Sequence, residues 1–514
     1  MRPPMSRRGM WQQRAMSAMG RVTNVSFPHW LAQYSVATYL LTLVLVTLVY
    51  STYMLPWYYM LSGVVSVLVF FFYGWSLAKR TSPLKLRKEK TFEQRIFWIA
   101  FIPRITWMIC IYLIFMQNYG NAFGFEKMDA SGYDMLGYSF KVAISEGHFM
   151  AEWNSEKGYL DISDMGYATY LGFIYLLTGT GGVTSFEGIG ADNLGIVVAR
   201  LLKCVWSSLT VLLIYRLAKR NFGEQPARVA AIFCALWPNF WYYCGVHLKE
   251  VEMVFLVVLY IERAEHMLRS RRFTAWEVGP VVLIAAILFT FRTPLAMVAI
   301  LSLLFAIVMS SSRVVTWGKR IIVGGLVVAL VGVTIGTRIE EKSYELMESV
   351  QSGQQKGNME WRAVRKDGNA FSKYAGAAVF APMIFSIPFP TMVDATGEQQ
   401  VQMLLNGGNF IKNILSFFAL LALIVLLMSG RWREYLLQIS FILGYLVVLV
   451  FSAFAHSERF HQPAMPFEFM LAAYGLSIAV TKLKYKRWFM YWCGLMFIAA
   501  IAWNWFKLAG RGLL

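Results

Sequence analysis

The fold of this chain is decided by the apolar run IFWIAFIPRITWMICIYLIFMQ, residues 96–117, and by the polar run MDASGY that follows at residues 128–133. A helix needs ~17–25 apolar residues to cross a bilayer, so the first run is long enough to span one. Asp129 in the second run therefore lies just beyond a predicted membrane span, at the depth of the lipid headgroups. An acid fixed there is placed to remove a proton from a hydroxyl group.

The composition places the whole chain in a membrane. Of its 514 residues, 57% are hydrophobic and only 15% are charged, which is well below the roughly 25% of soluble domains. The net charge of +19 indicates cytoplasmic anchoring rather than a surface for nucleic acid, because basic residues gather in cytoplasmic loops. We therefore predict an all-α polytopic membrane protein.

The cysteines indicate neither a disulfide framework nor a metal site. All five lie in apolar segments without metal-ligand spacing, and we expect them to be small buried packing residues. They are Cys110, Cys204, Cys234, Cys244 and Cys493.

Alternating basic loops give the predicted topology. Residues 1–32 contain five arginines and no acid, and they are predicted to form a basic cytoplasmic tail. Every basic cluster in a short loop falls on the cytoplasmic side if about thirteen apolar runs cross the membrane. Those runs are residues 33–54, 57–78, 96–117, 197–217, 229–245, 247–266, 278–291, 294–312, 319–337, 410–428, 435–455, 467–481 and 488–506.

The runs divide the rest of the chain into four predicted parts. Residues 33–95 hold two extra N-terminal spans and a basic loop, and residues 96–337 form the core. Residues 338–409 are an extracytoplasmic loop, and residues 410–514 are the C-terminal spans.

Two stretches of the first long outer segment have helical apolar spacing but are too short to span. They are residues 134–147 and residues 167–178. Both are predicted to be helices that lie in the membrane interface, and they are rich in tyrosine, as such helices often are.

Ionisable residues gather on the predicted outer side of the membrane. The positive-inside bias disfavours cations there, so we expect an anionic partner for them, such as the phosphate of a polyprenyl carrier lipid. The residues are Asp129, Lys249, Glu250, Arg292, Arg459 and His461.

A simpler interpretation exists for each cation. Lys249 could pair only with Glu250, or with Glu252 one helical turn on, and Arg459 only with Glu458. Surface pairs of this kind are common and weak. A lone histidine at the interface is often only a hydrogen-bonded structural residue.

Six stretches of the chain, in this order, resemble the GT-C glycosyltransferases, above all the protein O-mannosyltransferases and the lipid A aminoarabinose transferases. They are DASGY at 129–133, YLGFIYLLTG at 170–179, ARLL at 199–202, YRLAKRNFG at 215–223, YYCGVHLKE at 242–250 and RFHQPAMP at 459–466. The resemblance implies a GT-C-like helical bundle with residues 96–337 as its catalytic core. It also implies a polyprenyl-phosphate-linked sugar as the donor.

The positions of these residues and the resemblance together give expected roles for single residues. Asp129 would be the catalytic base, and Glu250 would be a second catalytic acid. Four residues would hold the donor phosphate: Lys249, Arg292, Arg459 and His461. Three residues would bind substrate: Tyr133, Asp134 and His247.

The chain departs from the family pattern at three points. Ala130 stands where many relatives have a second acid. A mechanism that needs a carboxylate pair there must use one of four other acids: Asp134, Asp161, Asp164 or Glu250. Two extra spans precede the core, and no large soluble domain follows the last span, so the acceptor would be recognised by loops, chiefly residues 338–409.

The expected function is an inverting transfer of a sugar to a glycan, lipid or protein acceptor on the extracytoplasmic face. Two alternatives stay open. An O-antigen-type polymerase or ligase would depend on Arg292, Arg459 and His461 rather than on Asp129. A lipid-linked saccharide flippase or other transporter would place its charges near the bilayer midplane, often with internal repeats.

Cofactor and compartment follow from the same residues. The sequence requires no cofactor, and a divalent metal would fit near Asp129 and Glu250, because carboxylates favour hard cations. The only Asn-x-Ser/Thr triplet, residues 24–26, falls in the predicted tail. Outer loops without a glycosylation triplet favour a bacterial inner membrane, with the site on the periplasmic side, over the endoplasmic reticulum.

Overall fold

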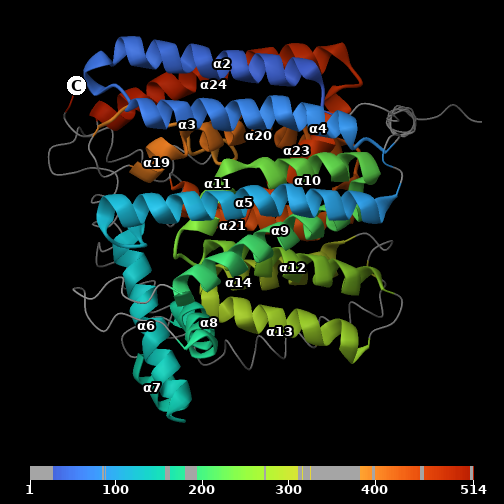
Figure 1. The fold of residues 1–514 in the computed structure, drawn as a ribbon. Coiled ribbons are helices and arrows are strands. Elements are labelled where there is room, and N and C mark those ends of the chain that lie inside the picture. The colour runs from blue at the N-terminus through green and yellow to red at the C-terminus, as the bar shows by residue number, and fades with distance from the viewer. Residues whose placement is uncertain are drawn as a thin grey trace, which may run out of the picture. The chain divides into compact units, whose positions relative to one another are not determined.

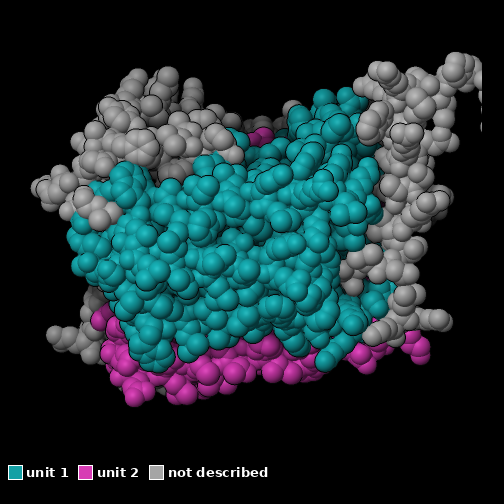
Figure 2. Space-filling view, turned by 90° about the horizontal axis from the view of Figure 1, so that it is seen from above, with its two compact units in different colours: residues 1–85, 218–230, 302–514 teal, residues 86–217, 231–301 magenta. Residues whose placement is uncertain are grey.

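The computed structural model describes residues 27–83, 86, 88–156, 162–179, 194–270, 274–310, 315, 325, 383–395, 400–451, 457–509 and 513. Within these residues the regular secondary structure is helical, apart from one isolated antiparallel bridge between Met54 and Val393. The chain forms two compact units (Figure 2). Unit 1 comprises residues 1–85, 218–230 and 302–514, and unit 2 comprises residues 86–217 and 231–301.

Unit 1 contains the N-terminal and C-terminal helices. Helix α20 packs against α23 and α3, and α2 packs against α24 (Figure 1). The helices are α2 (His29–Val49), α3 (Trp57–Leu68), α4 (Gly74–Arg80), α19 (Gln400–Leu404), α20 (Asn406–Met428), α21 (Leu436–Phe451), α22 (Glu458–His461), α23 (Met465–Ala479) and α24 (Leu483–Ala509).

A non-helical segment of unit 1 lies against these helices. Its apolar side chains at Phe385, Ile387 and Phe389 are buried, and Ile387 and Phe389 pack on Trp503 of α24. Non-helical backbone among apolar helices needs partners for its polar groups. Side chains of α20 and α24, Asn413 and Asn504, supply them.

Unit 2 contains most of the helices from the middle of the chain; α9 and α14 end in unit 1, and α10 begins there. The helices are α5 (Glu89–Tyr119), α6 (Lys127–Ser145), α7 (Phe149–Glu156), α8 (Ile162–Thr178), α9 (Leu194–Phe222), α10 (Glu224–Leu236), α11 (Pro238–Gly245), α12 (Glu250–Arg269), α13 (Ala275–Phe291) and α14 (Thr293–Met309).

The predicted membrane spans that lie among the described residues correspond to helices, which confirms the all-α polytopic class. In this part of the chain, six stretches are long and apolar enough to cross a membrane: α2, α3 with α4, α5, α9, α20 and α24. Shorter apolar helices are α13, α14, α21 and α23. The predicted run 319–337 lies outside the described residues, so the total of about thirteen spans stays a prediction, as do the five predicted parts of the chain.

One predicted run is divided in two. The apolar run 229–245 is broken at Trp237, whose backbone is extended with φ −70° and ψ 120°. The residue before a proline is pushed out of the helical region by the proline ring, and Pro238 follows here. Helix α10 therefore ends at Leu236, and α11 begins at Pro238.

The two predicted interfacial helices are present and begin earlier than the sequence indicated. Helix α5 ends at Gly120, which adopts the left-handed conformation with φ 65°, the usual way to stop a helix. After a short turn the chain enters α6, which Figure 1 shows running across the end of α5. Helix α8 packs closely on α6, because a Cβ atom at Gly172 would lie only 2.9 Å from the Cβ of Phe140.

Candidate active site

Helix α6 carries two acids on different faces. Asp129 lies in its first turn and is exposed, whereas Asp134 is buried at 1% exposure. Five residues turn an α-helix by about 140°, so the two side chains point in different directions. Asp129 is thus exposed on one face of α6, while Asp134 on another face is buried.

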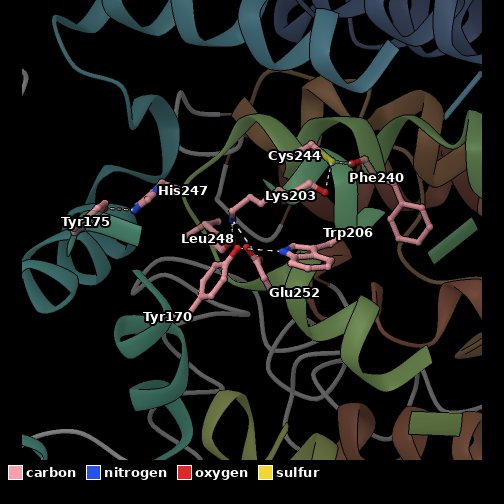
Figure 3. A network of polar contacts seen from close by, with 9 residues as sticks. All are labelled: Tyr170, Tyr175, Lys203, Trp206, Phe240, Cys244, His247, Leu248 and Glu252. Atoms are coloured by element: carbon pink, nitrogen blue, oxygen red, sulfur yellow. Dashed lines mark hydrogen bonds and ion pairs between the residues drawn. The ribbon is translucent and has the colours of Figure 1, made fainter. Parts of the chain in front are cut away.

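Asp134 begins a chain of three buried polar groups. The hydroxyl of Tyr175 on α8 contacts Oδ1 of Asp134. The same hydroxyl lies 3.1 Å from Nε2 of His247, and Figure 3 shows this second contact. His247 belongs to the tip between α11 and α12, residues 246–249. Tyr175 and His247 are both fully buried. The chain therefore connects α6, α8 and this tip.

Lys249, at the end of the tip, connects the tip to α8 and α13. Its ammonium group contacts Oδ1 of Asp164 and donates to the carbonyl of Ser163 at 3.2 Å, both on α8. It also donates to the carbonyl of Phe291 on α13 at 2.8 Å. The hydroxyl of Tyr133 reaches the same Asp164 oxygen at 3.1 Å. These three acceptors match the three N–H groups of a lysine, so Lys249 holds the tip, α8 and α13 together.

A second buried lysine lies on α9. Lys203 contacts the carbonyl of Leu248 and lies 3.6 Å from a carboxylate oxygen of Glu252 (Figure 3). Its ammonium group is also 5.1 Å from the centre of the Tyr167 ring. Two lysines therefore hold the tip in place: Lys203 contacts the main chain of Leu248, and Lys249 is itself a residue of the tip.

Arg200 lies one helical turn before Lys203 and is fully buried. Its Nη2 donates to the carbonyl of Ala122 at 2.5 Å. Among the described residues, its Nε and Nη1 atoms have no hydrogen-bond partner. Buried charged groups normally have partners, so this guanidinium is a candidate for binding a ligand or water.

Burial changes the pKa of two groups in this cluster. It raises the pKa of Tyr175 well above its usual value, and the nearby Asp134 carboxylate adds to the effect. It lowers the pKa of His247 well below its usual value, and the positive charges of Lys203 and Arg200 lower it further. Tyr175 therefore keeps its hydroxyl proton, and His247 stays neutral near pH 7.

The remaining predicted residues of unit 2 lie close to this cluster. Glu250 is the first residue of α12, is 1% exposed, and lies near enough to Lys203 to act on it electrostatically. Arg292 is half-buried and directly follows Phe291, whose carbonyl accepts from Lys249. The structure thus brings together Tyr133, Asp134, His247, Lys249, Glu250 and Arg292.

Arg459 and His461 belong to unit 1. His461 is 1% exposed, and its Nδ1 lies 2.7 Å from the ammonium group of Lys412. Their role in binding the donor phosphate stays a prediction, as do the roles of the other predicted site residues.

Two simpler expectations need correction. Lys249 pairs with Asp164, an acid far away in the sequence, rather than only with Glu250 or Glu252. Glu252 instead pairs with Lys203, a residue that the sequence did not single out. Cys110 is exposed on α5, whereas the other four cysteines are buried, because it lies on a face of α5 that no described helix covers.

Sequence reasoning also missed Arg200, Lys203 and Tyr175. A signal for the first two existed, since charged residues within an apolar helix of spanning length are rare and usually functional. Tyr175 gave no such signal, because it is one of many aromatic residues in an interfacial helix. Within the described residues, no group of three or more histidines, cysteines or acids is placed to hold a metal ion.

Residues 191–335 match the model of the dolichyl-phosphate-mannose-protein mannosyltransferase family. This part of the chain is therefore similar to membrane glycosyltransferases of the GT-C type, and the match covers less than half of the chain. No curated protein and no solved structure matches the chain significantly. The matched part of the chain includes α9 through α14, with the tip, Lys203 and Lys249. Asp129, Asp134 and Tyr175 precede it.

Proposed function

We propose that this protein is a glycosyltransferase that moves a sugar from a polyprenyl-phosphate carrier to an acceptor hydroxyl on the extracytoplasmic face, with Asp129 as the general base. The observation that carries the proposal is the placement of α6. This helix presents Asp129 to solvent, while its buried face is held through Asp134 and Tyr175 to the tip that carries His247 and Lys249. A base must be both accessible and rigidly held, and α6 provides both conditions.

Arg292 is the proposed ligand of the donor phosphate. It is half-buried and directly follows Phe291, whose carbonyl is fixed by Lys249. The guanidinium of an arginine matches two phosphate oxygens at once. Lys249 already contacts three acceptors, so we assign it chiefly to positioning the tip, α8 and Arg292.

The proposed reaction is a single displacement. Asp129 removes the proton of the acceptor hydroxyl as its oxygen bonds to the anomeric carbon, and the bond from that carbon to the phosphate oxygen breaks on the opposite face. The anomeric configuration is therefore inverted. The leaving phosphate takes the electron pair and is stabilised by Arg292. Base catalysis of this kind contributes ~10²–10⁴-fold.

A structural explanation of Asp129 is the main competitor. An acid in the first turn of a helix stabilises it by ~0.3–1 kcal/mol through the helix dipole. The Asp129→Asn variant separates the two explanations. Polyprenyl-phosphate mannose, named by the family description, would be the first donor, followed by other polyprenyl-phosphate hexoses, each with glycan, lipid and peptide acceptors.

We expect Asp129→Asn to lower turnover by ~10²–10⁴-fold while donor binding and the melting temperature change little. Glu146→Gln is the matched control, because Glu146 is an exposed acid at the other end of the same helix and should keep full turnover. Equal turnover by wild type and Asp129→Asn would remove Asp129 from the base role. Retention of the anomeric configuration in the product would exclude the single displacement.

The proposed compartment is a bacterial inner membrane with the site on the periplasmic side. A cysteine introduced at position 129 should react with a membrane-impermeant thiol reagent in intact cells from which the outer membrane has been removed. Labelling that requires permeabilisation of the inner membrane would place α6 in the cytoplasm and contradict the proposed sidedness.

A further inference from the structure

The buried chain of Asp134, Tyr175 and His247 has a definite hydrogen-bond direction. A carboxylate can only accept, so the single hydroxyl proton of Tyr175 is donated to Asp134. The oxygen of Tyr175 then presents a lone pair to Nε2 of His247 at 3.1 Å. Nε2 must therefore carry a hydrogen. The direct distance from Nε2 to Oδ1 of Asp134, 3.9 Å, is too long for a hydrogen bond, so Tyr175 is the necessary bridge.

This direction fixes the state of the other ring nitrogen. A neutral imidazole with a hydrogen on Nε2 has a bare lone pair on Nδ1. Burial and the charges of Lys203 and Arg200 disfavour a second proton on the ring. Nδ1 of His247 is therefore a hydrogen-bond acceptor. A buried acceptor of this kind normally has a hydrogen-bond donor next to it.

No such donor is found among the described residues. Nδ1 of His247 is buried and has no hydrogen-bond partner among them, and the same holds for the hydroxyl of Tyr167. The two rings lie 6.2 Å apart between their centres. Arg200 supplies unpaired N–H groups close by. Native proteins rarely leave buried polar atoms unsatisfied, and exceptions usually mark a bound ligand or water.

We propose that Nδ1 of His247 accepts a hydrogen bond from a hydroxyl group of the donor sugar, and that Asp134, acting through Tyr175, holds the ring in the tautomer that allows it. The proposal rests on the proposed function and deepens it. Nδ1 without a hydrogen cannot bind a phosphate oxygen, whereas a sugar hydroxyl can donate to it. The same hydroxyl oxygen can accept from Arg200.

The donor is the better source of this hydroxyl than the acceptor. His247 is fully buried in the tip that also carries Lys249, and Lys249 holds the carbonyl next to Arg292. Arg292 is the proposed ligand of the donor phosphate. The acceptor, in contrast, must reach Asp129, which is exposed on another face of α6. His247 is thus a specificity-determining residue, whereas Tyr175 and Asp134 are positioning residues.

The test compares kcat/KM for deoxy analogues of the donor to find which sugar hydroxyl the enzyme binds. The probe is the polyprenyl-phosphate hexose that wild type turns over fastest, together with its monodeoxy analogues. For wild type, removing the contacted hydroxyl should lower kcat/KM by about 5- to 150-fold, since a buried group loses its partner. The other deoxy positions should be affected differently, because they face other groups.

The His247→Gln variant removes the acceptor. A glutamine amide reaches the position of Nε2 and can still donate to Tyr175, but it places no acceptor at Nδ1. We expect this variant to turn over the parent donor and the critical deoxy analogue with kcat/KM values within about twofold of each other. The His247→Asn variant, whose amide oxygen can take the place of Nδ1, should restore part of the discrimination. A residue with a purely structural role would not change one deoxy position selectively.

Two variants serve as controls, and a third variant tests the proposal if His247→Gln does not fold properly. His148→Gln changes an exposed histidine outside the cluster, and Tyr138→Phe changes a half-buried tyrosine on α6; both should discriminate as wild type does. If His247→Gln has a much lower melting temperature, Tyr175→Phe provides the test. It leaves His247 in place but removes the group that fixes its tautomer, so discrimination should fall.

The possible failures are distinguishable. If His247→Gln slows the parent and every deoxy analogue by one common factor, His247 binds water or is structural, and the proposal is wrong. If selectivity changes only toward deoxy acceptors, the hydroxyl belongs to the acceptor, and the proposal is again wrong. If wild type neither binds nor turns over any polyprenyl-phosphate sugar, the proposed function itself fails and this inference fails with it.

Discussion

Two buried asparagines of unit 1, Asn413 and Asn504, form an amide cluster that differs from the ionisable cluster of unit 2 in what its side chains contact. In unit 1, Asn504 of α24 donates to the carbonyl of Pro390 at 3.1 Å and accepts from the amide of Met392 at 2.7 Å. Asn413 of α20 donates to the carbonyls of Ser386 and Pro388. Both amides therefore hold the main chain of one non-helical segment.

In unit 2 the buried side chains contact one another. Lysines meet acids at Lys249 with Asp164 and at Lys203 with Glu252, and Tyr175 joins Asp134 to His247. Several of their neighbours also keep polar atoms without a partner among the described residues. Satisfied amides that bind main chain stabilise a fold, whereas connected ionisable groups with spare donors and acceptors are typical of sites that bind a ligand.

Among the variants that test this comparison, the largest expected effect concerns Lys249. Lys249→Met removes the group that joins the tip, α8 and α13, and we expect turnover to fall by ~10²-fold, because small misplacements of reacting groups cost this much. The melting temperature should fall as well, since Asp164 loses its cation. Asp164 is 33% exposed, so water can partly solvate it and the fold should survive.

A double variant tells positioning from simple pairing. Asp164→Asn added to Lys249→Met removes the charge left alone, so the melting temperature should rise again while turnover stays low. Lys482→Met, at an exposed lysine in unit 1, controls for the loss of one positive charge. Recovery of full turnover in the double variant would mean that Lys249 serves only to neutralise Asp164, and the functional distinction between the two clusters would be lost.

The next effect concerns unit 1 and should appear in stability alone. Asn504→Leu leaves the amide of Met392 and the carbonyl of Pro390 without their side-chain partner. Unsatisfied buried groups cost ~1–3 kcal/mol each, so we expect the free energy of unfolding to fall by about 2 kcal/mol or more. Turnover per folded molecule should equal that of wild type.

Thermal unfolding and activity of the same purified sample check this prediction. Asn154→Leu, at an exposed position of α7, is the matched control and should change neither quantity. A loss of turnover per folded Asn504→Leu molecule with an unchanged melting temperature would show that the non-helical segment takes part in catalysis, contrary to the contrast drawn above.

Much of the fold could be predicted from the sequence, because the bilayer requires long apolar helices that hydropathy detects. The runs 33–54 and 410–428, for example, correspond to α2 and α20. The break at Trp237 could have been predicted from Pro238. The burial of the segment around Ile387 could not, because its polar backbone is satisfied by Asn413 and Asn504, which are far away in the sequence.

The candidate site was predicted less completely. Single ionisable residues at the ends of apolar runs, such as Lys249 and Arg292, were found because their cost in such places is a local property. Their partners were not, since Asp164 lies 85 residues before Lys249 and only the packing of α8 brings them together. Which of Asp129 and Asp134 is exposed also depends on the face of α6 that α8 covers.

The smallest expected effect is a pH dependence that sharpens the same comparison. His247 is surrounded by Asp134 on α6, Tyr167 and Tyr175 on α8, and Arg200 and Lys203 on α9. Its pKa in the folded protein is far below the usual value of about 6.5. As the pH falls below about 6.5, the unfolded chain binds a proton at His247 and the folded protein does not. The contribution to stability is therefore complete above this pH and is lost below it, by up to about 1.4 kcal/mol per pH unit.

The measurement is the melting temperature as the pH is lowered from about 7.5 to about 5.5. It should fall less steeply for His247→Gln than for wild type, whereas His148→Gln, at an exposed histidine, should follow wild type. Parallel curves for His247→Gln and wild type would mean that folded His247 carries a proton on Nδ1, and the ring could then not accept a hydrogen bond from a sugar.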